Sequence, residues 1–327
     1  MIITIWSLCL LATFAVGLGY GVRQKIILVK RLEERDKLHF IAEAGVKQGI
    51  TELMKDDEED EAYDYLGDDW SGSVSLFRDV VIDGGKYSVG YNCVNELTGL
   101  SEFRYGLIDE ERKININKID MHTIERLLKI IGLNEMEAQE LSASIVDWRD
   151  EDNQMSIPIG SGEDFYYRGL RYSYEAKDAD FEVLEELLLV RGMTRNIFGK
   201  IKNYITIYGD GKVNINTAPK EVLLALGLDS DLVDKIISFR YGHDGETYTE
   251  DDNAFTATHE IMPKLSQFTP LTDGEISQLS VVIDKYITTE SHYFMIESIG
   301  TLLDRKAAAH ITAVVSRNGK ILYWEES

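Results

Sequence analysis

The first 22 residues contain no charged side chain, and this stretch constrains the fold more than any other part of the chain. Residues 1–22 are mainly aliphatic, aromatic and small side chains. A run of about 20 apolar residues matches the thickness of a bilayer core and exceeds the roughly 7 to 15 apolar residues of a cleaved signal peptide. The sequence therefore predicts a single transmembrane helix over residues 1–22, because the rest of the chain is too polar to supply a second span.

The basic residues nearest this span all follow it: Arg23, Lys25, Lys30 and Arg31. Taken literally, the positive-inside rule would then keep the main body of the protein in the cytoplasm. A short basic leader upstream of the apolar run would reverse that orientation.

The predicted helix continues past the membrane, because residues 23–55 contain no proline and mix charges of both signs. One face carries small and apolar residues at steps of three and four: Leu38, Ala42, Gly45, Gly49 and Leu53. A helix over residues 2–55 is about 80 Å long and protrudes well beyond a bilayer. We expect its small residues to pack against partner helices, and the acidic run 56–61 to be a solvated loop.

Two β sections flank a long helical section. The first has apolar alternation at residues 80–82 and 87–93 around a glycine turn, and a further strand is expected at 103–108. The last part of the chain has strand patterns at 294–299, 311–315 and 321–324, and the last two are joined by a hairpin at Arg317-Asn318-Gly319-Lys320. Residues 113–287 have a helical pattern, with turns at Gly132, Gly192 and Gly227.

The fold class predicted from this order is α+β, with a large all-α domain inserted into a small domain whose strands come from both ends of the chain. The expected parts are a transmembrane helix (1–22), a helix extension plus strands (23–112), the inserted helical domain (113–290) and the closing strands (291–327). Two independent β domains are the alternative, which we rank lower because each β section is too short to bury much core alone.

A motif recurs within the helical section. Lys113-Ile-Asn-Ile-Asn117 precedes Ile-Gly-Leu133 and Val-Asp-Trp-Arg149, and Lys212-Val-Asn-Ile-Asn216 precedes Leu-Gly-Leu228 and Ile-Ser-Phe-Arg240. The spacing indicates a duplicated pair of helices. Trp148 and Phe239 occupy equivalent positions, where core packing is the preferred interpretation.

The apolar-Gly-apolar turns resemble the helix-hairpin-helix motif, whose backbone amides hold phosphate in DNA receptors. A membrane-anchored nucleic-acid-binding protein is therefore an alternative function. The charge opposes it, because 57 acidic against 34 basic side chains give a net charge of −23, and nucleic-acid affinity comes largely from neutralised phosphates. Acidic residues also follow the turns at Gly132 and Gly227.

Five stretches in order resemble the K-type minor pseudopilins of bacterial type II secretion systems. They are residues 113–117 (KININ), 145–152 (IVDWRDED), 162–167 (GEDFYY), 184–194 (LEELLLVRGMT) and 208–219 (YGDGKVNINTAP). The resemblance implies a pilin-like α/β domain with a helical insertion, an inner-membrane anchor and a periplasmic body. It also implies I- and J-type pseudopilins as partners, prepilin peptidase acting on a precursor with a basic leader, and no nucleic-acid partner.

Most pilin-like subunits carry a glutamate as the fifth mature residue, whereas the first acidic residue of this chain is Glu33. A carboxylate in the bilayer is costly unless it is paired, and in the family it pairs with the amine of a subunit already in the filament. A subunit that starts the filament has no such predecessor. The resemblance therefore implies a subunit at the pseudopilus tip that initiates assembly for protein export.

Clustered acidic residues form the candidate metal site. Asp147, Asp150, Asp152 and Asn153 precede Glu163 and Asp164 by about ten residues, and Ca²⁺ takes six to eight oxygen ligands. The resemblance favours a structural Ca²⁺ here over a solvated acidic loop. The expected ligands are Asp150, Asp152, Glu163 and Asp164. Residues 250–253 (EDDN) are a weaker second cluster.

Enzyme motifs are not recognisable in the sequence. His259-Glu260 is not followed by a second histidine at the zinc-protease spacing, and residues 209–213 lack the spacing of a phosphate-binding loop. We therefore expect no catalytic residues and no organic cofactor.

Overall fold

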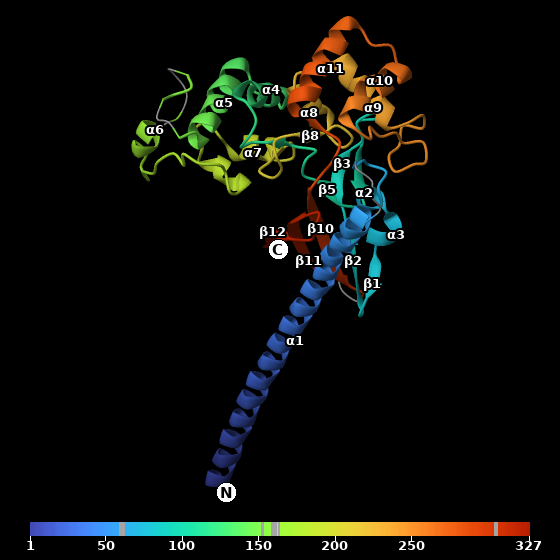
Figure 1. Cartoon of the computed structure of the whole chain (residues 1–327). Helices are drawn as coiled ribbons and strands as arrows, with labels where there is room; N and C mark the ends of the chain where they lie inside the picture. The colour runs from blue at the N-terminus through green and yellow to red at the C-terminus, as the bar shows by residue number, and fades with distance from the viewer. Residues whose placement is uncertain (59–62, 152–153, 158–161, 163, 304–306) are drawn as a thin grey trace.

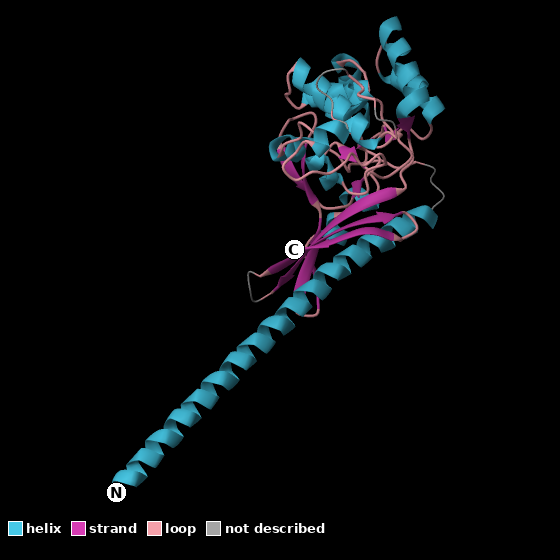
Figure 2. Ribbon diagram, turned by 90° about the vertical axis from the view of Figure 1, so that its left-hand side faces the viewer, coloured by secondary structure: helices cyan, strands magenta, loops and turns pink. Residues whose placement is uncertain are grey.

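The computed structural model describes residues 1–58, 63–151, 154–157, 162, 164–303 and 307–327. Its longest element is helix α1 (Ile2–Glu58), which confirms the continuous helix expected through residue 55. Residues 1–33 are exposed around the whole helix, whereas Leu38, Ile41, Ala42 and Leu53 are buried. Helix α1 is therefore a free stalk over its first half and part of a packed body over its second half (Figures 1 and 2).

One antiparallel sheet unites both ends of the chain. Its strands, in spatial order, are β1 (Val80–Ile82), β2 (Gly85–Val89), β10 (Tyr293–Leu302), β11 (Ala308–Ser316) and β12 (Ile321–Glu326). The short strand β5 (Ile108–Asp109) also pairs with β10. Residues 85–89 pair with 298–302, which confirms that sequence-distant strands share a sheet. The α+β class and the hairpin at 317–320 are confirmed as well.

The small residues of α1 pack against this sheet, not against partner helices, so that expectation was wrong. Ala42 is fully buried, and a Cβ on Gly45 would overlap the Ser298 hydroxyl. A Cβ on Gly49 would lie 3.0 Å from Ile296. Short side chains let the helix approach the strands closely, and here the nearest partner is the chain's own sheet.

Residues 87–93 do not form one strand, as the alternation had suggested. The chain leaves the main sheet at Gly90, where a Cβ would overlap the backbone of Arg104, and a separate hairpin follows. Strands β3 (Tyr91–Val94) and β4 (Ser101–Arg104) form that hairpin. Two single-turn helices, α2 (Asp69–Gly72) and α3 (Val74–Phe77), precede β1 and cover the sheet beside α1.

Two similar helical units lie between β5 and β10 and form the upper part of the molecule (Figure 1). The first contains β6 (Ile114–Asn115), α4 (Met121–Ile130), α5 (Glu135–Arg149), α6 (Asp164–Arg168), the 3₁₀ helix η1 (Leu184–Leu189), α7 (Arg195–Ile201) and β7 (Ile205–Thr206). The second contains β8 (Val213–Asn214), α8 (Lys220–Ala225), α9 (Ser230–Arg240), η2 (Thr258–Glu260), α10 (Ile261–Phe268), α11 (Asp273–Tyr286) and β9 (Ile287–Thr288). Each unit is closed by a parallel strand pair, β6 with β7 and β8 with β9.

The two units repeat the same internal hydrogen bonds. Arg149 and Arg240, at the ends of α5 and α9, each donate to two backbone carbonyls of the segment that opens their own unit, within residues 116–119 and 215–218. A guanidinium with several fixed donors suits this bridging of one helix end to a loop.

Equivalent asparagines close both units. The Asn117 side chain exchanges two hydrogen bonds with the backbone of Phe181, and the Asn216 side chain does the same with Phe255. These bonds join residues 64 and 39 positions apart, so each asparagine holds a long loop against the start of its unit.

Gly300 lies where α1 meets β10, and a Cβ there would come within 2.7 Å of both the Ala42 nitrogen and the Leu38 carbonyl oxygen. We expect Gly300→Ala to lower the free energy of unfolding by about 1 to 3 kcal/mol, because backbone atoms cannot move aside. The measurement is urea unfolding of the full chain in detergent. The matched control is Gly199→Ala in α7, where a Cβ meets nothing within 4 Å and helix propensity favours alanine. Equal effects of the two substitutions would contradict the close packing.

Candidate functional site

The exposed half of α1 is the first candidate site. By length and composition α1 is long and apolar enough to cross a membrane. Above the apolar stretch the helix also has an uncovered side: Phe40 is 66% exposed, whereas the adjacent Ile41 is only 3% exposed. An exposed phenylalanine next to the packed body is a suitable contact for another protein, since aromatic side chains dominate interface energetics.

The helical turns are a second candidate, but their backbone amides already have partners. Asp229 accepts a hydrogen bond from the Leu232 nitrogen at 2.9 Å, and Asn134 accepts one from the Glu137 nitrogen at 3.0 Å. Thr194 does the same for the Ile197 nitrogen. These caps satisfy amides that a phosphate would need, and Asp229 adds a negative charge.

A hollow of 390 Å³ lies between the turns at Gly132 and Gly192. Glu137 and Glu140 line it together with Arg191 and Lys200, and Lys200 donates to the Ile131 carbonyl. The mixed charges of this lining do not form a basic surface of the kind that tracks a nucleic-acid backbone.

Of the four residues expected to bind calcium, Asp152 and Glu163 lie outside the described residues. Asp150 follows α5 and closes it through its own backbone nitrogen, which donates to the Val146 carbonyl at 3.0 Å. Asp164 begins α6, and its carboxylate accepts hydrogen bonds from Arg168 at 2.7 Å and from the Ala176 nitrogen at 3.0 Å. Asp164 therefore already fastens the loop that follows α6.

Two carboxylates in the same region have an oxygen that is buried and has no hydrogen-bond partner among the described residues: Asp147 Oδ2 and Asp178 Oδ1. Asp147 is fully buried, and its other oxygen accepts from the Ser156 nitrogen at 2.8 Å. The Asp178 nitrogen donates to the Trp148 carbonyl, which brings its segment to the end of α5. Burial raises the pKa of Asp178, and the charges of Asp164 and Glu175 raise it further.

Sequence spacing placed Asp147 in the wider acidic group but missed Asp178, which lies 31 positions further along the chain. The available signal was the repeat itself: Asp178 precedes Phe181 by three positions, as Asp252 of the second acidic cluster precedes Phe255. Phe181 and Phe255 are the two phenylalanines held by the equivalent asparagines.

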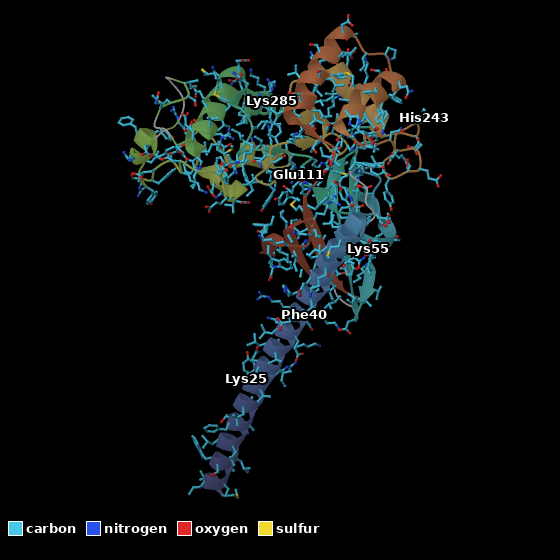
Figure 3. All side chains as sticks on the ribbon, in the orientation of Figure 1. Lys25, Phe40, Lys55, Glu111, His243 and Lys285 are labelled. Carbon is cyan, nitrogen blue, oxygen red and sulfur yellow. The ribbon has the colours of Figure 1, made fainter. Side chains whose placement is uncertain are left out.

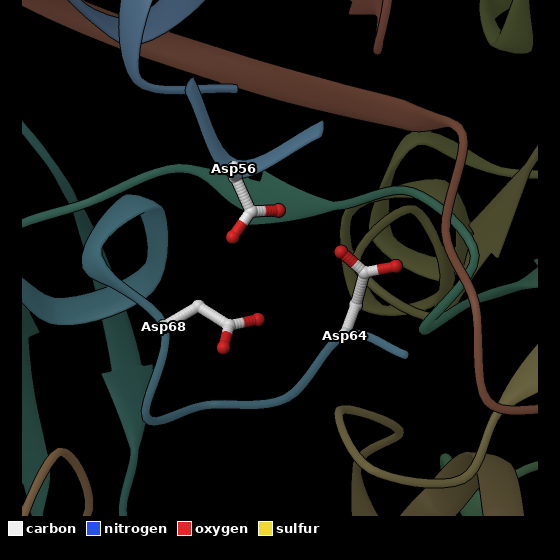
Figure 4. Close-up of side chains that lie close together, drawn as sticks. All are labelled: Asp56, Asp64 and Asp68. Atoms are coloured by element: carbon white, nitrogen blue, oxygen red, sulfur yellow. The ribbon is translucent and has the colours of Figure 1, made fainter. Parts of the chain in front are cut away.

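A third group of carboxylates lies where α1 ends (Figure 4). Asp56, Asp64 and Asp68 each offer an oxygen within 4.8 Å of the others, which is close enough for a metal ion. Arg317 already supplies a positive charge there: its guanidinium pairs with Asp56 at 2.7 Å and with Asp64. The expected solvated loop is thus only partly correct, since Asp56, inside the acidic run, is half-buried in an ion pair, and residues 59–61 of the run lie outside the described residues.

The buried side chain of Asp68 is stabilised by hydrogen bonds and not by a positive charge. One oxygen accepts from the Tyr65 nitrogen and from the Trp70 indole, both at 2.9 Å. Burial raises the pKa of Asp68 to about 8, and it raises the pKa of Asp64 to about 7 although Arg317 opposes that shift. Burial therefore favours the protonated form of Asp64 and Asp68, and Arg317 opposes that effect at Asp64.

Asp64 and two further acidic residues, Asp109 and Glu111, lie where the sheet meets the helical units. The Asp64 backbone carbonyl accepts hydrogen bonds from the side chains of Asn214 and Asn216, both at 3.1 Å. Asp109, fully shielded on β5, accepts from the hydroxyls of Thr217 at 2.5 Å and Ser291 at 2.7 Å. Burial raises the pKa of Asp109, and burial together with the Asp109 charge raises that of Glu111 to about 8. We refer to Asp64, Asp68, Asp109 and Glu111 as the joint carboxylates.

The raised pKa of Asp68 gives a pH-dependence with a defined sign. The folded protein keeps a proton that the unfolded chain releases above its ordinary pKa of 3.8, so this contribution to stability is largest below that value and is lost as the pH rises through about 8. Asp68→Asn preserves an accepting oxygen and cannot titrate. We expect the stability of the wild type relative to this variant to fall by about 3 to 4 kcal/mol between pH 5 and pH 8.

The measurement is urea unfolding of both proteins at pH 5, 6.5 and 8, with Asp69→Asn as the exposed neighbouring control. A stability difference between wild type and Asp68→Asn that stays constant, or that grows with pH, would contradict the protonated state of Asp68.

Comparison with known proteins agrees with this architecture. The profile of the family described as type II secretion system (T2SS), protein K, matches residues 94–210. Type II secretion system protein K of Aeromonas hydrophila is 24% identical over 288 residues, which cover 86% of this chain and 80% of that protein.

A solved structure shares the fold: a chain of the GspK-GspI-GspJ complex from the type 2 secretion system of enterotoxigenic Escherichia coli. The TM-score is 0.66 at 15% sequence identity, and the match covers 91% of this chain and 99% of that chain. The matched family profile, the relative and the shared fold agree with one another: this chain is similar to protein K of the type II secretion system over most of its length.

Proposed function

We propose that this chain is a minor pseudopilin that is anchored in the inner membrane by α1, carries its body in the periplasm and starts the pseudopilus from its tip. The role is structural: it helps to build the fibre that exports proteins across the outer membrane. Similarity to protein K of the type II secretion system supports the system in which it acts. The free half of α1 supports the assembly role, because a fibre of this kind is held together by its stalk helices.

The proposed position at the tip of the pseudopilus rests on one observation. The sequence has no acidic residue before Glu33, so the apolar part of α1 has no carboxylate that needs a positive partner in the bilayer. The two helical units support the same position. They lie above the sheet at the end away from the stalk, and the first unit projects sideways (Figure 1). Lateral packing would exclude such a bulky insertion from other positions in a thin fibre.

The partners proposed for this chain are I- and J-type pseudopilins. The solved relative was crystallised in a GspK-GspI-GspJ complex, and 99% of that chain is covered by the match. Prepilin peptidase would act on the precursor. Such complexes require an exposed contact surface on the body, and Phe40 with the stalk below it provides one.

Phe40 gives the direct mutational test. We expect Phe40→Asp to weaken co-purification of the full chain with I- and J-type pseudopilins about tenfold, because loss of an aromatic anchor typically costs more than 1 kcal/mol. The thermal midpoint of the chain alone should not change, since this side chain is 66% exposed. The control is Phe165→Asp, on a 93% exposed phenylalanine of α6 at the far end of the first unit.

A nucleic-acid receptor is the competing function, and it makes the opposite prediction. A DNA gel shift at physiological salt should show no complex with the full chain, because the amides of the helical turns are capped and the net charge is −23. Clear binding of DNA together with failure to recover either pseudopilin would reject the assembly role.

We also propose that a structural Ca²⁺ binds beside the end of α5. Asp147 and Asp178 fit a hard cation, because each has a buried carboxylate oxygen with no partner among the described residues. Asp150 lies three positions after Asp147 in the chain, and Asp152 and Glu163 remain proposed ligands. Asp164 is a weaker candidate than the sequence suggested, since Arg168 and the Ala176 nitrogen occupy its two oxygens.

Chelation tests this ion. At a calcium concentration 100 times the dissociation constant, bound metal stabilises the folded state by about 2.7 kcal/mol, or a midpoint shift of about 4 °C for a chain of this length. We expect that shift in the full chain, and its loss in Asp147→Asn. Asp180→Asn is the control, because Asp180 lies in the same loop but pairs with Lys118 at 2.8 Å. An unchanged wild-type midpoint after chelation would reject the site.

A further inference from the structure

The strongest unassigned charge pattern lies on the stalk, just beyond its apolar part. Arg23, Lys25, Lys30 and Arg31 are all exposed, and none forms an ion pair with any described residue. Residues 1–32 contain no acidic side chain, and the first acidic residues, Glu33 and Glu34, follow the last of the four basic residues within one helical turn. We refer to the four basic residues as the basic collar; Figure 3 shows its member Lys25 projecting from α1 well below the body.

The collar lies at the depth of lipid headgroups. Residues 2–22 span about 31 Å as a helix, which equals the hydrocarbon thickness of a typical bilayer. Arg23 and Lys25 therefore emerge in the headgroup layer. Lys30 and Arg31 follow within about 12 Å, and their long side chains can extend back toward it.

The collar surrounds the helix. At about 100° per residue, Arg23 and Lys30 lie on one side, Arg31 lies about 80° away and Lys25 faces the opposite side. A single neighbouring helix would call for charges on one face. Charges on all sides fit a ligand that surrounds the helix, as lipids do.

The charge of the rest of the chain is consistent with lipid as the ligand of the collar. The net charge is −23, so the chain beyond residue 32 is strongly acidic and is repelled by an anionic surface. An apolar groove along Thr13, Gly17 and Gly21 also ends at Lys25, which allows an acyl chain to lie on the helix with its headgroup at that ammonium.

We propose that the basic collar binds the headgroups of anionic phospholipids and thereby fixes the depth of the stalk in the membrane. This inference rests on the proposed membrane anchoring. Attraction of the collar and repulsion of the body act in the same direction, since both hold the sheet and helical units away from the bilayer.

The experiment places the full chain in nanodiscs of phosphatidylcholine containing a minor share of phosphatidylglycerol, and counts co-released lipids by native mass spectrometry. We expect phosphatidylglycerol to be enriched about fivefold over its share in the disc, the equivalent of about 1 kcal/mol for one basic side chain near a surface. The enrichment should disappear at about 1 M salt, where the Debye length is about 3 Å.

The test variant replaces all four collar residues by glutamine and should lose the enrichment. The control variant replaces four exposed basic residues of the first unit and its linker by glutamine: Arg171, Arg195, Lys202 and Lys212. It should keep the enrichment, because the same number of charges is removed far from the span.

A chain that enters the discs without preference for phosphatidylglycerol overturns the inference and leaves the anchoring intact. A chain that stays outside the discs overturns the anchoring itself. Equal lipid binding by both variants also overturns the inference. If the wild type shows no lipid preference and the collar variant loses its pseudopilin partners, the inference is overturned in favour of an acidic protein partner.

Discussion

The close contact between α1 and strand β10 determines the arrangement of the whole molecule. It depends on residues without bulk, since Ala42, Gly45 and Gly300 bring the backbones of helix and strand together, and Ser298 donates to the Ala42 carbonyl at 2.7 Å. The contact divides α1 at about residue 38 into a stalk and a packed half. It also fixes β10 at the centre of the sheet, where both ends of the chain meet.

The joint carboxylates lie where the inserted helical units connect to the sheet. The chain leaves the sheet at β5 and returns at β10, so the two crossing segments need firm attachment to the body. Polar side chains provide it: Asp64 binds Arg317 and the two asparagines, and Asp109 binds two hydroxyls. Burying four acidic groups is unfavourable when they are charged, and the raised pKa values show that protonation lowers that cost. The hydrogen bonds of Asp64 and Asp109 attach the start of the second helical unit to the sheet.

Local patterns were sufficient to predict much of this fold. The helix through residue 55, the last three strands and the hairpin at 317–320 follow from periodicity and turn residues, and the KININ and KVNIN repeats indicated duplication. The partner of the small face of α1 was not predictable, because glycine and alanine indicate close approach without naming what approaches. The break at Gly90 and the contact between the Asp178 segment and the end of α5 depend on residues far apart in the chain, which one sequence does not reveal. The calcium assignment remains a prediction for the same reason.

The central claim is that the stalk lets this subunit stand at one end of a fibre, because its apolar helix carries no carboxylate that requires a predecessor. The most direct measurement is electron microscopy of pseudopili assembled with a chain that bears a gold-binding tag after Ser327. Gold at a single end of each fibre is the predicted result. Gold distributed along the shaft would contradict the account.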